Sequence, residues 1–247
     1  MKWIDLGRKK YQVVWDLQER LRQARLKNKI DNLILFVEHP AVITIGKQKD
    51  SDLDFKVSPS RLQKQGIEVV ASNRGGRLTY HGPGQRVIYC VVELKSLGVS
   101  IKQFVDQLEQ VCLEVLARYD LSGSLQEGTP GVWVGKNKIA FIGLHVSQGV
   151  TIHGISFNIS RDLKAWENIV PCGLATTGIT ALGLLLNKEP AWAEVRATFL
   201  SAFEKIFSQE ISWMEEKVAV DSSTDCGSSL TAGISSKLAD SSGSDFK

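Results

Sequence analysis

Two apolar runs separated by a three-residue turn constrain the fold of this chain more than any other feature. Residues 131–134 and 138–143 are mainly apolar, and Gly135-Lys136-Asn137 lies between them. Glycine and asparagine in so short a link favour a tight turn, so the two runs are predicted to form a β-hairpin. A hairpin joins antiparallel neighbours, and this argues against a doubly wound parallel sheet.

Further apolar runs and helical patterns alternate along the chain in mixed order. Ser100 is predicted to cap a helix, with Gln103 completing a capping box. Since the order is not regularly β-α-β, the expected fold class is α+β: a mixed β-sheet with helices packed on one side. The other predicted segments are strands at 33–37, 41–46, 87–92 and 151–159, a helix at 11–27, and a last helix that begins at Pro190.

The helical segments each carry a stripe of apolar side chains at a spacing that places them on one face. Cys112 falls within such a stripe and Cys90 within a β-branched run, so both thiols are interpreted as packing residues. The stripe residues are Val14, Leu17, Leu21 and Ala24; Phe104, Leu108, Val111, Cys112 and Val115; and Val195, Phe199, Phe203 and Phe207.

The composition changes near Val218. Residues 218–247 are rich in Ser, Thr, Gly and Asp and offer too little apolar surface to offset the entropy of an ordered chain. The chain is therefore predicted to consist of one folded domain, residues 1–217, and a disordered tail, residues 218–247. Cys226 would be a free, exposed thiol in this tail.

Charge and hydropathy exclude several classes of protein. Lys and Arg exceed Asp and Glu by only 30 − 27 = 3, which is too little for a typical nucleic-acid-binding protein. No apolar run reaches the length of a membrane helix, and the first residues lack the apolar core of a signal peptide. The basic cluster is interpreted as a solvated helix face, with docking of an acidic partner protein as the alternative. Its members are Arg20, Arg22, Arg25, Lys27 and Lys29.

The cysteines suggest neither disulfides nor a metal site. Cys90, Cys112, Cys172 and Cys226 lie far apart, with no C-x-x-C pair and no zinc-like histidine spacing. A reducing, cytoplasmic location is the simplest expectation, and no metal or other cofactor is predicted.

Residues 74–85 stand out because they combine several glycines with Pro83, His81 and two arginines between apolar runs. Glycine allows the backbone to approach a ligand closely, so such a loop can present bare N–H groups to a bound molecule. A simple turn is the common alternative for one glycine-rich loop.

Cys172 and Lys138 are the candidates for chemistry. Cys172 lies in Val170-Pro171-Cys172-Gly173, outside any helical or strand pattern, although an inert buried cysteine is the commoner outcome. A nucleophilic cysteine needs help to ionise, since its usual pKa is ~8.5. Lys138 leads into an apolar strand, and burial would lower its pKa enough for it to serve as a base. The alternative is a solvated lysine leaving a turn, like Lys136.

The glycine-rich run resembles the signature of lipoyl(octanoyl) transferases. The resemblance covers roughly Trp3 to Leu186 and includes, in the family's order, Pro171-Cys172-Gly173 and the strand that starts at Lys138. The chain departs from many members in reading Thr180-Ala181-Leu182 where they have Thr-Ser-Leu. The matching residues of the run are Arg74, Gly75, Gly76, Thr79, Tyr80, His81, Gln85 and Tyr89.

The resemblance implies the catalytic domain shared with biotin and lipoate protein ligases. It implies transfer of octanoate from octanoyl-acyl carrier protein to a lysine of lipoyl domains, with neither ATP nor metal, as the first step of endogenous protein lipoylation. The implied acceptors are 2-oxoacid dehydrogenase complexes and the glycine cleavage H protein. Cys172 would carry the acyl thioester, with Lys138 as its partner. The implied substrate-binding residues are Arg74, Gly75, Gly76, Arg77, Leu78, Thr79, Tyr80, His81, Phe141, Ile142, Gly143, Gly154, Ile155 and Ser156.

Two alternatives differ in chemistry. An ATP-dependent lipoate or biotin protein ligase would share the fold but activate a free acid as an acyl-adenylate, with no need for Cys172. A non-catalytic module would use the glycine-rich loop to bind an anionic ligand. The cysteine motif and the ending of the loop favour the transferase; this ending is Thr79-Tyr80-His81-Gly82-Pro83-Gly84-Gln85.

Overall fold

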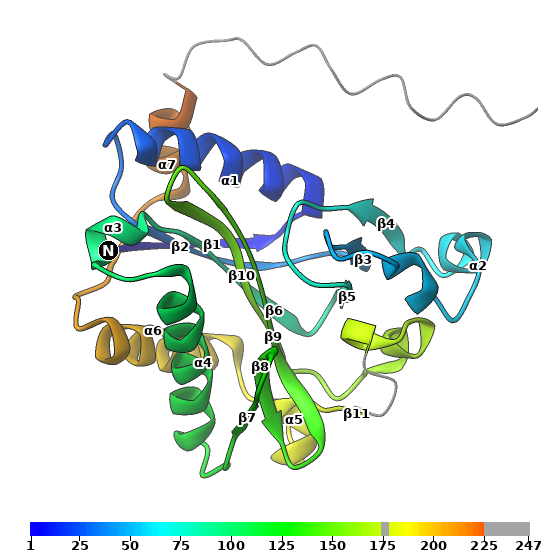
Figure 1. The fold of residues 1–247 in the computed structure, drawn as a ribbon. Helices are drawn as coiled ribbons and strands as arrows, with labels where there is room; N and C mark the ends of the chain where they lie inside the picture. Colours follow the sequence, from blue (N-terminus) through cyan, green and yellow to red (C-terminus); the bar gives the residue numbers. More distant parts are fainter. Residues whose placement is uncertain (174–177, 225–247) are drawn as a thin grey trace, which may run out of the picture.

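The computed structural model describes residues 1–173 and 178–224 and is built around one large mixed β-sheet (Figure 1). The sheet has nine strands in the order β12-β1-β2-β6-β10-β9-β8-β7, with β11 pairing with β9. β12-β1-β2 and β11-β9 are parallel pairs, and the remaining pairs are antiparallel. The strands are β1 (Lys2–Arg8), β2 (Leu33–Glu38), β6 (Gln85–Val91), β7 (Ser124–Gln126), β8 (Thr129–Val134), β9 (Asn137–Ser147), β10 (Val150–Asn158), β11 (Gly178–Ile179) and β12 (Ser212–Trp213).

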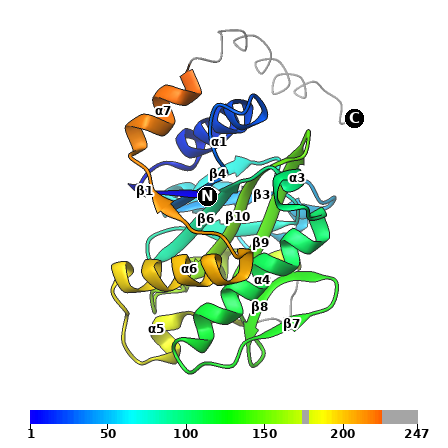
Figure 2. The ribbon, with the colours of Figure 1, turned by 90° about the vertical axis from the view of Figure 1, so that its left-hand side faces the viewer.

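Helices cover both faces of this sheet. Figures 1 and 2 show α1 (Tyr11–Leu26) and α7 (Glu216–Thr224) on one face, and α4 (Ile101–Ala117) and α6 (Trp192–Phe207) on the other. Along β2, Ile34 and Phe36 pack toward α4 and α6, whereas Leu33 and Leu35 pack toward α1. The predicted α+β class is confirmed. The prediction that helices pack on only one side of the sheet was wrong. The unbroken apolar run of β2 is the pattern of a strand buried on both faces.

The predicted helices are confirmed with small shifts at their ends. All the stripe residues of α1, α4 and α6 named above are buried. Ser100 accepts a hydrogen bond from the Gln103 backbone and Gln103 bonds back, which is the predicted capping box. α6 begins at Trp192 rather than Pro190, and it is not the last helix, since α7 follows it.

The hairpin of β8 and β9 is also confirmed. Val134 pairs with Asn137, so the turn consists of Gly135 and Lys136 alone. Gly135 has a φ of +59°, which suits a tight turn between twisted strands.

A second sheet, absent from the sequence-based expectation, lies beside the first (Figure 1). Its order is β4-β3-β5, with β3 (Val42–Ile45) parallel to β4 (Glu68–Ala71) and antiparallel to β5 (Leu78–His81). Residues 78–81 of the glycine-rich run are therefore strand rather than loop. These residues form a strand because they pair with β3, which is distant in sequence. The remaining short elements are η1 (Ser51–Asp54), α2 (Pro59–Lys64), α3 (Leu94–Leu97), η2 (Lys164–Asn168), η3 (Pro171–Gly173) and α5 (Leu182–Leu185).

The predicted boundary between Lys217 and Val218 falls inside α7, so the expectation of disorder was wrong for residues 218–224. Ala219 is buried against the α1 face of the sheet, and Glu216 pairs with Lys9 at 2.8 Å. α7 is ordered although it has few apolar residues, because α1 and the sheet supply the rest of the core against which it packs. Residues 225–247, including Cys226, lie outside the described residues.

The basic cluster on and after α1 is only partly solvated, which corrects that interpretation. Arg22 and Arg25 are buried: Arg22 pairs with Glu19, and Arg25 pairs with Glu93 at 2.7 Å and donates to Asn32. These two arginines tie α1 to the sheet. Within the described part of the chain, no helix is long and apolar enough to cross a membrane.

Candidate active site

A small, deep cavity of about 50 Å³ lies where the second sheet meets β9 and β10 of the first. It is narrow, with room for only a few waters. Twelve of the predicted substrate-binding residues line it: Arg74, Gly75, Gly76, Arg77, Thr79, His81, Phe141, Ile142, Gly143, Gly154, Ile155 and Ser156. The other lining residues are Tyr11, Val87, Tyr89 and His153.

Leu78 and Tyr80 do not line this cavity. Successive side chains of a strand point to opposite faces, so β5 directs Thr79 and His81 into the cavity. Leu78 and Tyr80 instead pack with Trp166 and Ile169 in a separate apolar cluster. The resemblance treated residues 74–81 as one loop and therefore could not separate the two sets.

Arg74 holds the turn that forms one wall. Arg74 is 7 % exposed, and its guanidinium donates to the Thr44 hydroxyl at 2.8 Å and to the carbonyls of Thr44 and Arg77 at 2.6 and 2.7 Å. Gly75 adds a backbone bond to the Leu144 carbonyl at 2.9 Å. These hydrogen bonds give Arg74 a framework role, since they engage its guanidinium within the protein.

Arg77 links this turn to the segment that carries Cys172. It pairs with Asp54 at 2.5 Å and donates to the backbone carbonyls of Lys49 and Asp50. A Cβ atom placed on Gly173, whose φ is +70°, would lie 2.7 Å from the Arg77 side chain. A larger residue at 173 would therefore displace η3 or Arg77.

Gly154 is required by the close approach of two strands. A Cβ atom there would lie 2.2 Å from the Ile88 carbonyl oxygen of β6, so no other residue fits without moving the backbone. The preceding residue, His153, has a φ of +62°, a strained value for a non-glycine residue. Such strain at a cavity wall is typical of a functional site.

Three histidines, His39, His81 and His153, are buried in or beside the cavity and are held uncharged. Burial lowers the pKa of His39 to about 4. Burial, with help from the charges of Arg74 and His145, lowers the pKa of His153 to about 3. Burial and the neighbouring His39 lower the pKa of His81 well below its ordinary value. Near neutral pH these rings offer lone pairs rather than positive charge.

Tyr11 of α1 organises the three rings. Its ring is stacked with those of His81 and His153, at centroid distances of 5.9 and 6.4 Å, and meets His39 edge-on at 5.4 Å. Its hydroxyl bonds to Ser72 at 2.8 Å. His39 in turn contacts the Tyr89 hydroxyl at 2.8 Å. The site is thus packed between β6, which follows β5 in sequence, and α1, which is far from β5 in sequence.

Unsatisfied polar atoms add to the evidence for a binding site. Thr79 Oγ1 and His153 Nδ1 are buried and have no hydrogen-bond partner in the described ranges 1–173 and 178–224. A buried polar group without a partner costs roughly 1–3 kcal/mol. A bound molecule could satisfy both atoms.

Lys138 is buried, with 1 % of its surface exposed, whereas Lys136 on the turn is exposed. The interpretation as a solvated lysine was therefore wrong. Its ammonium donates to the Pro130 carbonyl at 2.9 Å and lies 4.6 and 5.0 Å from the ring centroids of Trp133 and Phe141. Phe141 also lines the cavity, so Lys138 lies directly behind its wall.

Two neighbours shape the surroundings of Lys138. A Cβ atom on Gly131, whose φ is +138°, would lie 2.4 Å from Lys138 Cε, so glycine makes room for the lysine stem. Glu109 of α4 accepts from the Gly131 backbone at 2.9 Å, and burial raises the pKa of its carboxyl.

The backbone of Cys172 belongs to η3, and its side chain lies outside the described residues. The flanking structure brings this segment toward Lys138: β11 follows it and pairs Ile179 with Lys138, and Thr180 donates to the Lys138 carbonyl at 3.0 Å. η3 also packs against β5. Within the described ranges, no cluster of three or more His, Cys, Asp or Glu side chains could hold a metal ion.

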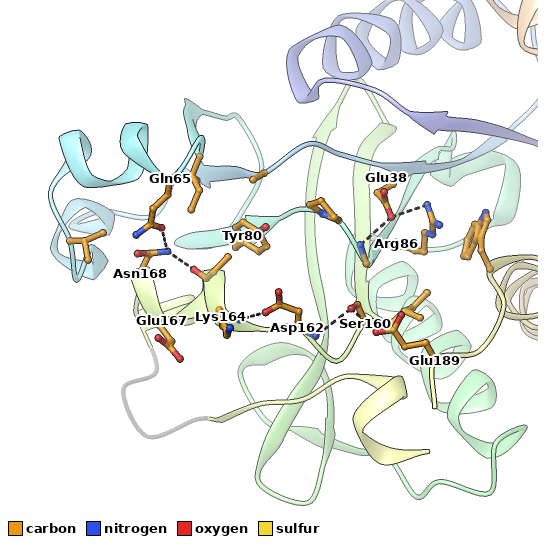
Figure 3. Close-up of a pocket in the computed structure, with 18 of the residues that line it drawn as sticks. Glu38, Gln65, Tyr80, Arg86, Ser160, Asp162, Lys164, Glu167, Asn168 and Glu189 are labelled. Carbon is orange, nitrogen blue, oxygen red and sulfur yellow. Dashed lines mark hydrogen bonds and ion pairs between the residues drawn. The ribbon is translucent and has the colours of Figure 1, made fainter. Parts of the chain in front are cut away.

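A larger cleft, of about 910 Å³, lies near the same strand (Figure 3). Tyr80 lines it from β5, and Gln65, Asp162, Lys164 and Glu167 lie around its rim. At its other end, Glu38 accepts from the Gly84 backbone at 3.1 Å and pairs with Arg86 at 3.3 Å. Its polar groups are largely exposed or paired with one another.

Sequence reasoning missed several members of the site. Tyr11, His39 and His153 were not among the predicted site residues. Tyr11 belongs to an ordinary helical apolar stripe, and nothing in its sequence position marks the cavity. His39 before Pro40 and His153 before Gly154 are the only local signals.

The chain is similar in sequence to one protein family and to individual proteins of that family. The family described as the Lipoyl protein ligase A/B catalytic domain matches residues 10–204. An octanoyltransferase of Alkaliphilus metalliredigens is 36% identical over 209 residues, which cover 84% of this chain and 95% of that protein. An octanoyltransferase of Chloroflexus aurantiacus is 38% identical, covering 83% of this chain and 93% of that protein.

Solved structures share the fold at low identity. A bipartite lipoate protein ligase from Thermoplasma acidophilum is 13% identical with a TM-score of 0.69, covering 91% of this chain and 89% of that one. A biotin protein ligase from Aquifex aeolicus is 16% identical with a TM-score of 0.53, covering 84% and 70%. At such identities the likeness concerns the fold alone.

Proposed function

The chain belongs to the lipoyl protein ligase A/B catalytic domain family, among its octanoyltransferases, and on this premise we propose its donor, acceptor and chemistry. Octanoyl-acyl carrier protein supplies the octanoyl group. A single lysine of a lipoyl domain, in 2-oxoacid dehydrogenase complexes or the glycine cleavage H protein, accepts it.

The proposed chemistry proceeds through a thioester on Cys172. Lys138, as a neutral amine, takes the thiol proton, and the thiolate attacks the thioester carbonyl of the donor. The C–S bond of the carrier breaks as the new C–S bond forms, and the departing carrier thiolate takes the proton back from Lys138. In the second half, the acceptor amine displaces Cys172 and an amide results.

The burial of Lys138 is the observation that carries this proposal. Burial removes a lysine ammonium from water and so favours the neutral amine, which is what a base requires. Lys138 lies at the start of β9, where Ile179 of β11 pairs with it, and residues 174–177 separate β11 from the Pro171-Cys172-Gly173 segment. A ligase that forms acyl-adenylates needs neither a nucleophilic cysteine nor a base to activate one.

The energetics require no nucleotide. Exchange of one thioester for another is nearly isoenergetic, and conversion of a thioester to an amide is downhill. The enzyme therefore only lowers barriers, through the base and through backbone N–H groups of the glycine turn or η3 that could stabilise the oxyanion.

The acyl chain is proposed to enter along Phe141, Ile142 and Ile155, the apolar part of the cavity wall. Burial of a CH₂ group contributes ~0.8 kcal/mol, so an eight-carbon chain offers several kcal/mol for binding. Ligand pockets usually measure ~300–1,000 Å³, so these side chains must move apart to admit the chain. Leu78 faces away and is no longer a candidate for this slot.

The test compares two acyl sources with a lipoyl domain as acceptor. The proposal predicts octanoylation from octanoyl-acyl carrier protein without ATP, and none from free octanoate with ATP and Mg²⁺. Cys172→Ser should abolish the reaction, and Cys112→Ser, at a buried thiol within the α4 stripe, serves as the control. Activity from octanoate and ATP that survives Cys172→Ser would instead establish a ligase.

A further inference from the structure

The protonation pattern of His81 can be derived from its hydrogen bonds. His81 Nδ1 contacts Gln85 Oε1 at 2.7 Å. Gln85 Nε2 donates to the Tyr80 carbonyl at 3.1 Å and to Asn158 Oδ1 at 2.9 Å, and Asn158 Nδ2 donates to the Thr180 carbonyl at 3.0 Å. These side chains are all at most 5% exposed.

Two main-chain carbonyls fix the direction of this chain. A carbonyl oxygen only accepts, so the amide group of Gln85 that faces Tyr80 must be its NH₂, and the group of Asn158 that faces Thr180 must also be its NH₂. If either side-chain amide were rotated by 180°, its oxygen would face a main-chain carbonyl oxygen, and no hydrogen bond could form. Gln85 therefore presents its oxygen to His81, and His81 Nδ1 must carry the proton.

A neutral imidazole with its proton on Nδ1 has a bare lone pair on Nε2. The surroundings keep the ring neutral: it is buried, the Tyr11 ring stacks on it, and the cationic Arg74 and the imidazoles of His39 and His153 lower its pKa. No hydrogen bond joins His81 Nε2 to any residue in the ranges 1–173 and 178–224. The ring lines the cavity, so this lone pair is available to a bound molecule.

The proposed function supplies one kind of partner for such an atom. The acyl carbonyl and the sulfur of a thioester are acceptors and cannot bond to a lone pair. The acceptor lysine brings N–H groups, and its nitrogen must reach the acyl carbon in the second half of the reaction. Resting on that function, we propose that His81 Nε2 accepts the proton that the acceptor amine loses when it attacks the octanoyl thioester.

The step balances as follows. The neutral amine forms the C–N bond, and its nitrogen becomes cationic and acidic. One N–H proton passes to His81 Nε2 while the C–S bond breaks and its electron pair stays on sulfur. His81 passes this proton through water to the neutral amine of Lys138, and the resulting ammonium protonates the sulfur, so His81, Lys138 and the Cys172 thiol return to their starting forms. Even a weakly basic imidazole serves, because the proton becomes acidic only as the bond forms.

His81 and Lys138 thus divide the two half-reactions. His81 acts on the nitrogen nucleophile, and Lys138 acts on the sulfur atoms. Gln85 and Asn158 are positioning residues, because they act on the amine only through the tautomer of His81. The chain ends at Thr180, the residue whose backbone bonds to Lys138, so one network supports both bases.

The decisive variant is His81→Asn, because the asparagine amide can still donate to Gln85 near the Nδ1 position while Nε2 is lost. Rates of acyl-enzyme formation from octanoyl-acyl carrier protein and of acyl-enzyme consumption by a lipoyl domain are measured separately. We expect formation within about threefold of the unmodified chain and consumption slowed at least ~10²-fold, the usual contribution of a general base. Gln85→Leu should also slow consumption selectively, by about tenfold, since it removes the anchor of the tautomer.

The control is His145→Asn on β9, since His145 does not line the cavity. Equal slowing of both half-reactions by His81→Asn, or slowing of neither, would overturn the inference. Failure of the proposed function appears elsewhere, in the absence of any acyl-enzyme from the unmodified chain. The two ideas can therefore fail independently.

Discussion

The two hollows near β5 differ in a way that separates a reaction site from a surface feature. The cleft of Figure 3 has about 910 Å³ and the cavity about 50 Å³. The cleft is lined by charged groups that are exposed or paired with one another. The cavity is lined by neutral histidines, by the unsatisfied Thr79 Oγ1 and by a strained backbone at His153.

Desolvation explains why the smaller hollow is the better candidate. A lone pair or hydroxyl in water is already satisfied, whereas the same group in a buried cavity interacts strongly with whatever enters. Keeping such groups buried costs stability, which the rest of the fold must supply. The difference in cost, rather than the difference in volume, distinguishes the two hollows.

The largest expected effect concerns the base behind the cavity wall. Lys138→Ala should slow octanoyl transfer at least ~10²-fold, as loss of a general base does, and should raise the pH at which Cys172 reacts with iodoacetamide. Lys138→Arg should restore little, because guanidinium keeps its proton. Steady-state transfer assays measure the first effect and alkylation rates the second.

Lys136→Ala provides the matched control, because Lys136 lies exposed on the turn only two residues away. Near wild-type transfer by Lys138→Ala would show that the buried lysine is not the base.

The next effect is a loss of stability in acid, which follows if the buried histidines are neutral in the folded protein. The pKa values of His39 and His153 in the fold are about 4 and about 3, below the unfolded value of ~6.5. The unfolded chain therefore binds more protons, and the free energy of unfolding should fall as pH drops from about 6.5 to about 4. Each histidine contributes up to ~1.4 kcal/mol per pH unit.

Urea unfolding over this pH range measures the slope. His39→Gln should reduce this slope by the equivalent of about one proton taken up on unfolding. Carboxylates contribute equally to both chains, so their contribution cancels in the difference between the two slopes. An unchanged slope would mean that His39 is not held neutral by burial.

A third effect concerns the helix that supports the cavity wall from outside. α1 supplies Tyr11 to the cavity, and α7 covers α1. The free energy of unfolding should be at least ~1 kcal/mol lower for a chain that ends at residue 215 than for a chain that ends at residue 224. This is a large change for so few residues. Urea unfolding of the two truncated chains makes the comparison, and equal stabilities would show that α7 does not contribute.

The smallest effect is expected in the larger cleft. Arg61 lines it and is exposed, so Arg61→Ala should change the free energy of unfolding by no more than ~0.5 kcal/mol and leave transfer kinetics almost unchanged. A rise of the KM for the lipoyl domain by tenfold or more would break the comparison, because the cleft would then belong to the site.

The sequence predicted the apolar framework far better than the cavity. Periodicity located α1, α4, the β8–β9 hairpin and the capping box at Ser100, since each depends on neighbours close in sequence. It did not reveal the second sheet, because the pairing of β5 with β3 joins segments more than thirty residues apart. Nor did it show that β2 is covered on both faces.

The site was predicted from the resemblance rather than from physical patterns. The apolar strand after Lys138 made it a candidate and the resemblance favoured it over a solvated lysine, but only the structure shows that it is buried. It also grouped Leu78 and Tyr80 with Thr79 and His81, and the alternation along β5 separates them. Tyr11 and the chain from His81 to Thr180 depend on long-range contacts that no local pattern encodes.

The identity of the acylated residue tests the account most directly. Cys90 and Cys112 are buried, and burial raises the pKa of Cys90 to about 12 and that of Cys112 well above its usual range, so both should be inert. After incubation with octanoyl-acyl carrier protein and no acceptor, peptide mapping by mass spectrometry should find one octanoyl group on Cys172, removable by hydroxylamine. An octanoyl group on Cys90, Cys112 or Cys226, or none at all under conditions of active transfer, would contradict the account.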